Sequence, residues 1–239
     1  MGKFWFDGKS CTEFGIVASG AGSFNSPVRD ITMATIPGRN GDLVIDNGRF
    51  KNINVTYPVF IHRDFSNNAM KARAWLRGDT GYKRLEDEYD LDCFRLGVFT
   101  GPLDFDMKFL NRAGEAYLTF NCKPQRFLKS GETAIRMSSP DTLHNFTLFD
   151  AQPIITVYGS GSGQLTVSGC TVEIKSMTDQ ITLDCERMDA YRKVGDGASE
   201  NKNGSIYAPE FPVLKPGDNT ISWTGGVTAV DIIPRWWTL

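Results

Sequence analysis

One stretch near the carboxyl end, residues 211–223 (FPVLKPGDNTISW), constrains the fold more than any other segment. The pair Pro216 and Gly217 predicts a turn. The residues after it alternate between two strand faces, with Asn219, Ile221 and Trp223 on one and Thr220 and Ser222 on the other. A strand with one packed and one wet face is typical of an antiparallel β-sandwich. Because no catalytic motif accompanies it, the sequence favours an assembly or binding protein over an enzyme.

Similar short strands follow one another closely in the second half of the chain. They are predicted at residues 154–158, 164–167, 171–175, 180–185, 220–223 and 227–233. Glycine-rich segments, residues 159–163 and 168–169, are predicted as the turns between the first three. This spacing indicates an antiparallel sandwich. Since residues 124–152 are rich in turn signals and poor in periodicity, we expect two domains, residues 1–130 and 131–239.

The first half is also predicted to be mostly β. Residues 43–50 indicate a hairpin that turns at Asp46-Asn47-Gly48, because Asn-Gly suits a tight type I′ turn. Residues 52–62 alternate clearly, and Pro58 places that strand at an edge or a bulge. Residues 81–93 read as a short strand, an acidic turn and another strand.

One helix is predicted over residues 67–77, with Ser66 as the N-cap and Gly78 as the stop. Met70, Ala74 and Arg77 line one side, and Ala69, Ala72 and Leu76 lie beside them. Trp75 is expected to pack this helix on a sheet.

The overall composition narrows the classes of partner. The formal net charge is −2 and the basic residues are dispersed, which argues against nucleic acid and anionic lipid. The sequence contains no apolar run of transmembrane length and no signal-peptide start, so we expect a product made in a cytoplasm, with no membrane partner. The five cysteines, Cys11, Cys93, Cys122, Cys170 and Cys185, are widely spaced and are expected to be buried small hydrophobic residues.

No motif in the sequence is specific enough to identify a catalytic, cofactor or metal site. Residues 159–163 lack the Lys-Ser/Thr ending of a phosphate loop. His62 and His144 lack a second ligand at metal-binding spacing, and His62 is expected at a surface or rim. Three carboxylate pairs are spaced by two residues and are interpreted as solvated or turn residues: Asp90/Asp92, Asp104/Asp106 and Asp184/Glu186.

Several segments together resemble the distal tail proteins (Dit) of long-tailed siphophages, also called the siphovirus tail component family. They are residues 36–43 (IPGRNGDL), 52–61, 74–76 (AWL), 85–90 (LEDEYD), 118–124 (LTFNCKP), 181–186 (ITLDCE) and 211–220 (FPVLKPGDNT). Each fragment is short, but their order and spacing extend over nearly the whole chain.

The resemblance implies a mainly β fold of two domains. The first would be a β-sandwich with one helix and a hairpin arm that forms a homo-hexameric ring, and the second a galectin-like antiparallel β-sandwich. It further implies a non-enzymatic hub in the virion tail tip, which joins the tail tube protein to the tail-associated lysin or fibre and to receptor-binding or baseplate proteins.

Two other functions stay open at this point. A carbohydrate-binding module would use the tryptophans Trp223, Trp236 and Trp237 as a stacking platform. Trp236 and Trp237 are adjacent, so on a strand one would pack inward and the other would be free for a partner. A glycan-cleaving enzyme would use Asp184 and Glu186, which on a strand would lie about 6.6 Å apart, within the range of glycosidase carboxylates.

Overall fold

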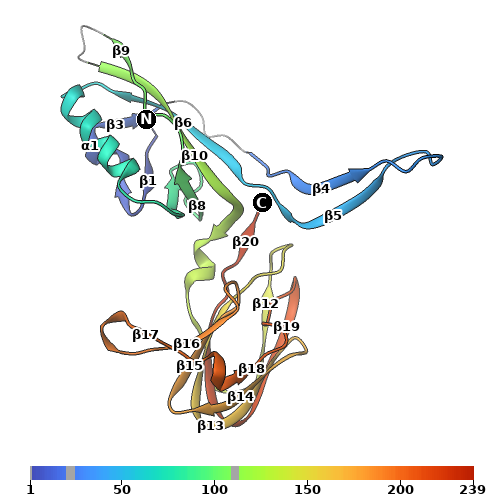
Figure 1. Cartoon of the computed structure of the whole chain (residues 1–239). Helices are drawn as coiled ribbons and strands as arrows, with labels where there is room; N and C mark the ends of the chain where they lie inside the picture. Colours follow the sequence, from blue (N-terminus) through green and yellow to red (C-terminus); the bar gives the residue numbers. More distant parts are fainter. Residues whose placement is uncertain (1, 20–24, 109–112) are drawn as a thin grey trace. The chain divides into compact units, whose positions relative to one another are not determined.

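The computed structural model describes residues 2–19, 25–108 and 113–239 (Figure 1). The fold is mainly β, with a single α-helix in these ranges and two large sheets, as the sequence predicted. The chain forms two compact units: Met1–Arg126 together with Leu239, and Phe127–Thr238.

The first unit is built on one curled sheet in the order β2-β1-β7-β8-β10-β6-β3, with β9 also paired to β10. Gly2 and Ala18 exchange backbone hydrogen bonds of 3.1 and 3.2 Å, which bring the chain before β1 onto β3 and draw the two ends of the sheet together. The elements are β1 (Phe4–Phe6), β2 (Lys9–Ser10), η1 (Cys11–Phe14), β3 (Ile16–Ala18), β6 (Ile53–Ile61), β7 (Lys83–Asp87), β8 (Cys93–Phe99), β9 (Asp106–Lys108) and β10 (Ala113–Leu128).

Strand β6 confirms the predicted alternation. Its inward residues, Ile53, Val55, Tyr57, Val59 and Ile61, are all buried. Across the ladder, β10 buries the face that carries Ala116, Leu118, Phe120 and Cys122. These two strands therefore supply much of the first core.

Pro58 lies inside β6, where it is paired with Tyr117 of β10. Pairing of β6 with β3 ends at Val59 and Ala18, and the Ser19 amide then donates to the Pro58 carbonyl at 2.8 Å. In an antiparallel ladder the return bond would come from the amide of residue 58, which proline lacks. Among the described residues, the pairing of β6 with β3 extends no further than this bond.

Helix α1 (Phe65–Arg77) begins earlier than the sequence predicted. Its N-cap is Asp64, not Ser66, and the Asp64 carbonyl accepts the Asn68 amide at 3.0 Å. The buried face consists of Phe65, Ala69, Ala72 and Leu76, whereas Met70 is 65% exposed. The buried Phe65 anchors two additional residues at the start of the helix, which helix propensity alone did not indicate.

Trp75 packs the helix on the sheet as expected. Its ring stacks on Phe14 with centroids 4.2 Å apart, and its indole N–H donates to the Phe6 carbonyl at 3.2 Å. This contact ties α1 to β1 and to the short helix η1.

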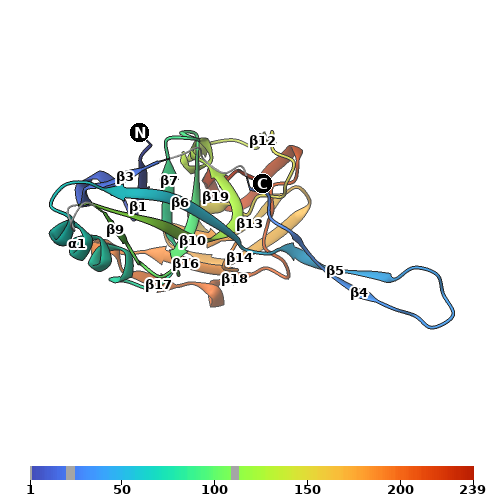
Figure 2. The same ribbon diagram turned by 90° about the horizontal axis from the view of Figure 1, so that it is seen from above.

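A separate two-stranded sheet forms a hairpin arm from β4 (Arg29–Ala34) and β5 (Leu43–Phe50). In both views it extends away from the rest of its unit (Figures 1 and 2). The predicted turn at residues 46–48 is wrong. Strand β5 continues through these residues, and the chain reverses direction at residues 35–42. Asn47 and Gly48 instead belong to a bulge opposite Asp30, where the positive φ of Gly48 (70°) is used without reversing the chain.

The second unit is one continuous antiparallel sheet folded over a core. Its elements are η2 (Lys129–Glu132), β11 (Ile135–Met137), β12 (Asp141–Asn145), β13 (Ile154–Val167), β14 (Cys170–Met177), β15 (Gln180–Asp184), β16 (Asp189–Lys193), η3 (Gly195–Gly197), β17 (Ser199–Asn201), η4 (Asn203–Ser205), β18 (Ile206–Tyr207), β19 (Gly217–Ile233) and β20 (Trp237–Thr238).

Strands β13 and β19 run through both halves of the fold. Residues 154–158 of β13 lie between β15 and the end of β19, and residues 161–167 lie between β14 and the start of β19. The first half continues outward through β16 and β17 and through β11, and the second through β18 and β12. Ile155 and Leu165, one from each half, are fully buried in the same core cluster.

The glycine-rich segment 159–163 is therefore a bend within one strand, and its prediction as a turn between two strands is wrong. The predicted strands 220–223 and 227–233 are likewise one strand, β19. At the bend the two backbones approach so closely that a Cβ on Gly226 would overlap the Ser160 carbonyl oxygen, and one on Gly159 would overlap the Gly226 carbonyl. Glycine is needed here for close approach of the chains.

Candidate assembly surfaces

The carboxylate pair considered for catalysis is an ion-pair cluster. Asp184, at the end of β15, is only 7% exposed, and its carboxylate accepts from the Arg235 guanidinium at 3.2 Å. Arg235 also pairs with Glu186. The Asp184 carboxylate further accepts the amides of Glu186 and Arg187 at 3.2 and 3.3 Å. Asp184 is therefore a turn residue, one of the two predicted possibilities, and it is buried in place of being solvated.

Asp90 and the two histidines do not form a common site. Asp90 pairs with Arg126. His62 is exposed and lies parallel to the Phe60 ring, with centroids 5.8 Å apart. His144, in the second unit, contacts the exposed Asp218 at 2.6 Å. Across the ranges that the structure describes, no group of three or more His, Cys, Asp or Glu residues could hold a metal ion. None of the helices in those ranges is long and apolar enough to cross a membrane.

The tryptophans do not form an open platform. Trp236 is 3% exposed. Trp237 stacks on Phe149 with centroids 4.4 Å apart, and its indole N–H donates to the Asp150 carbonyl at 2.9 Å. Trp223 is partly buried against the core. Trp236 thus packs inward, as expected for one member of the pair, whereas Trp237 is partly exposed and packs on Phe149.

The cysteines are buried as expected, apart from the partly exposed Cys170, and all five are free thiols. Burial raises the pKa of Cys122 and of Cys185 to about 12. They are structural residues and not candidate nucleophiles.

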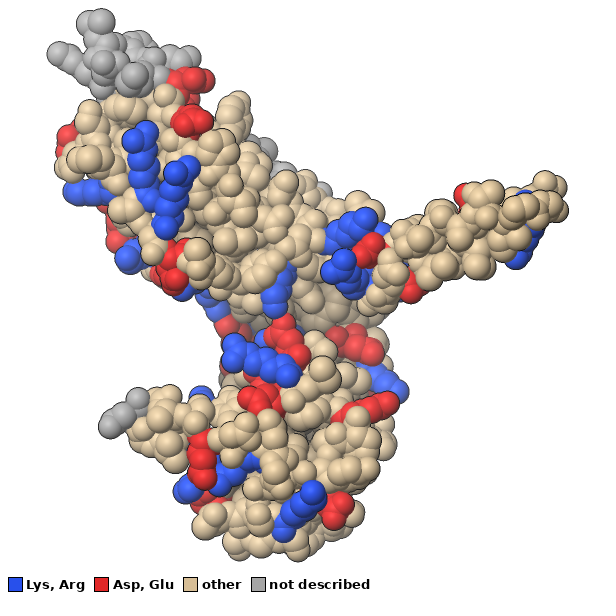
Figure 3. All heavy atoms as spheres, in the orientation of Figure 1, with Lys and Arg blue, Asp and Glu red and all other residues tan. Residues whose placement is uncertain are grey.

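The hairpin arm is the clearest candidate for a contact surface. The exposed large hydrophobic side chains of residues 28–45 are Val28, Ile31, Met33, Ile36, Leu43, Val44 and Ile45. Met33 lies opposite Val44 on one face of the arm, and Ile45 lies opposite Thr32 on the other. Both faces of the arm are thus apolar and exposed, and Figure 3 shows few charged side chains along it.

The base of the arm is fixed by ion pairs at the bulge. Arg29 pairs with Asp46 at 2.5 Å. Asp30, only 9% exposed, accepts from Arg49 at 2.8 Å and lies 3.5 Å from the Lys51 ammonium. The hydrogen bond from Arg49 holds the pKa of Asp30 below its usual value. The strands are therefore joined firmly at the base, while the apolar part beyond it has no packing partner among the described residues.

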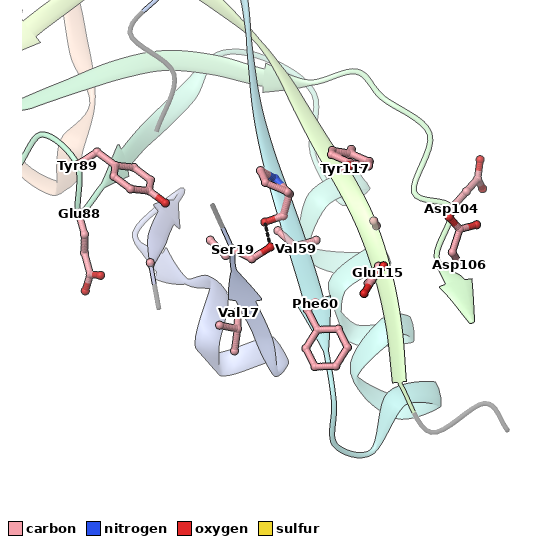
Figure 4. Close-up of a pocket in the computed structure, with 14 residues that line it drawn as sticks. Val17, Ser19, Val59, Phe60, Glu88, Tyr89, Asp104, Asp106, Glu115 and Tyr117 are labelled. Carbon is pink, nitrogen blue, oxygen red and sulfur yellow. Dashed lines mark hydrogen bonds between the residues drawn. The ribbon is translucent and has the colours of Figure 1, made fainter. Parts of the chain in front are cut away.

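A second candidate surface is an open groove of about 1100 Å³ across the outer face of β3, β6 and β10 (Figure 4). Val17, Phe60 and Tyr117 supply apolar surface along it. The carboxylates that line it are Glu88, Asp104, Asp106 and Glu115. Figure 4 shows Glu88 with Tyr89 on one side and Asp104 with Asp106 on the other. Sequence analysis noted Asp104 and Asp106 as a pair but did not connect them with Glu88 or Glu115, because the groove forms from segments far apart in the chain.

Comparisons with known proteins give a result at the level of structure only. No protein-family model matches the chain, and no curated protein matches it. Among solved structures, the SPP1 Dit (gp 19.1) protein matches over 100% of both chains, with a TM-score of 0.72 and 11% identity. That protein is described as a paradigm of the hub adsorption apparatus in phages that infect Gram-positive bacteria.

A chain of the phage P2 baseplate in its activated conformation with Ca also matches, over 97% of both chains, with a TM-score of 0.55 and 8% identity. The same baseplate with Sr gives the same values. At these identities the likeness establishes the fold. The chain has the fold of the SPP1 Dit protein, and the resemblance noted in the sequence is confirmed at that level.

Proposed function

We propose that this protein is a structural hub of a long-tailed phage tail tip or baseplate, and that six copies form a ring. The observation that carries the proposal is the full-length likeness to SPP1 Dit, a hub protein. In the tail tip, the ring would join the tail tube protein to the tail-associated lysin or fibre and to receptor-binding or baseplate proteins. Its role would be to hold partners, with no reaction catalysed.

The arm supports this proposal physically. A two-stranded hairpin with apolar residues on both faces is marginally stable alone in water. Exposed apolar surface of this kind marks a site of protein contact. In a closed ring each copy offers two different surfaces to its neighbours, and an arm that reaches a neighbour satisfies that requirement. The carbohydrate-binding alternative has less support, because Trp236 is buried and Trp237 packs on Phe149.

The proposal is tested by the mass of the chain in solution, by native mass spectrometry and light scattering, alone and with the tail tube protein of the same phage. We expect a species of six times the chain mass. The double variant Met33→Ser with Val44→Ser should weaken each subunit contact by more than about tenfold, because each side chain contributes on the order of 1 kcal/mol when buried.

The matched control is Tyr207→Ser, which removes an exposed apolar side chain from the second unit and should leave the mass unchanged. A wild-type chain that remains monomeric both alone and with the tube protein contradicts the ring. A six-fold species that the arm variant does not weaken contradicts the role of the arm.

A further inference from the structure

Basic side chains outnumber acidic ones on the exposed side of helix α1 and just before it. Over residues 63–77 there are four basic side chains and one acidic side chain, Asp64. The basic residues are Arg63, Lys71, Arg73 and Arg77, and all four are exposed. None of them forms an ion pair with an acidic residue in the described ranges. Figure 3 shows Lys and Arg side chains gathered over this part of the molecule.

The groove on β3, β6 and β10 carries the opposite charge. Asp104, Asp106 and Glu115 are exposed along it, and Glu88 is partly neutralised by Lys3, whose ammonium lies 3.8 Å away. The residues that line the groove therefore include four acidic side chains and no lysine or arginine. The groove also offers apolar surface from Phe60 and Tyr117, the latter 73% exposed.

The helix and the groove lie on opposite sides of the same sheet. The inward face of β6, which includes Val59, shares one core with Ala69 and Leu76 of the helix. The alternate residues of β6 and β10, including Phe60 and Tyr117, face the groove. Figure 4 shows α1 behind the two strands and the groove side chains in front of them. One copy therefore cannot bring its own helix into its own groove, but two copies can meet in this way.

We propose that α1 of one copy docks in the acidic groove of the next copy, an inference that rests on the proposed ring. The contact joins two different surfaces and leaves each copy with the complementary surface free, which is the geometry that a closed ring requires. A helix of 13 residues is about 20 Å long, a length suited to a groove that crosses several strands. Opposite charges select this pairing and disfavour helix-to-helix or groove-to-groove contacts.

The test is a charge exchange between the two surfaces of the full chain. Arg73→Glu and Asp106→Arg each place like charges together and should weaken the subunit contact by about tenfold. Chains that carry both substitutions regain opposite charges at every contact and should return to within about threefold of the wild type. The wild-type contact should also weaken as salt is raised, because the charges lie near solvent.

Matched controls are Lys193→Glu and Glu173→Arg, which reverse exposed charges in the second unit and should leave assembly unchanged. Circular dichroism verifies that each variant is folded. If single reversals leave the six-fold species intact, the docking is wrong and the ring proposal survives. If both single variants weaken the contact and the double variant does not recover, the residues act separately and the docking is also wrong. A wild-type chain that never assembles overturns both proposals together.

Discussion

Asn219 is the buried polar residue on which the start of β19 depends, and its removal gives a sharp test of the second unit. Its side chain is fully buried. The amide nitrogen donates to the carbonyls of Lys215 at 2.8 Å, Gly217 at 2.9 Å and Leu143 at 3.3 Å. The side-chain oxygen accepts from the Lys215 amide at 2.8 Å and the Ser168 hydroxyl at 2.7 Å. One side chain thus holds together the turn before β19, strand β12 and the turn after β13.

Asn219→Ala removes the five hydrogen bonds that the Asn219 side chain makes with these groups. A buried group that loses its only partner costs about 1–3 kcal/mol, and several groups are affected here. We expect a total loss of about 4 kcal/mol in the free energy of unfolding, a large fraction of the roughly 5–15 kcal/mol typical of a domain. Asn219→Asp keeps the side-chain shape but replaces the donor nitrogen with an acceptor facing three carbonyls. It should therefore cost at least as much as the alanine variant.

The assay is hydrogen exchange of peptides from β13 and β19 followed by mass spectrometry, because it reports on the second unit alone. A loss of 4 kcal/mol lowers protection by about a thousandfold when exchange follows unfolding. The control is Thr220→Ala on the exposed face of the same strand, which should change stability by less than about 0.5 kcal/mol. If Asn219→Asp exchanges at the wild-type rate, the hydrogen-bond argument is refuted.

Two further predictions concern the backbone bend and a buried thiol. Gly226→Ala places a Cβ against the Ser160 carbonyl and should lower stability by about 3 kcal/mol in urea unfolding, whereas Gly195→Ala, with open space around it, should be nearly neutral. For Cys122 the folded pKa is raised to about 12 from 9.0, so its stabilising effect is intact below pH 9 and is lost as pH rises toward 12. Between pH 8 and 10.5 the wild type should lose up to about 2 kcal/mol more than Cys122→Ala, and equal losses would contradict the assignment.

The strongly periodic segments could be predicted from the sequence because local pattern and tertiary burial agree in them. The inward residues of β6 are the apolar residues of a strict alternation, and the β19 segment after Gly217 also alternates, with the polar Asn219 among its inward residues. The helix was found for a similar reason, although its start was misplaced because Phe65 is held by packing and not by capping chemistry.

The two misplaced turns share one physical cause: glycine and Asn-Gly signals show which backbone conformations are possible, not which one the fold requires. Gly48 has a positive φ in a bulge, where a turn was predicted. Gly159 and Gly226 serve a close approach between two strands whose pairing is set far along the chain. Sequence pattern within a short window carries no information about that partner strand, so a bend and a turn look alike.

The sequence predicted a strand in the arm but did not predict that its apolar residues would be exposed. Residues 43–45 are continuously apolar, a pattern that belongs to strands covered on both faces. In the folded chain these residues are exposed on both faces. The sequence pattern therefore predicts that they are buried, but no surface of the same copy covers them. A monomer with such a strand would expose an edge prone to uncontrolled pairing. The contradiction between pattern and exposure disappears if the covering surface belongs to another subunit, which is why the arm supports assembly more directly than any polar residue of the chain.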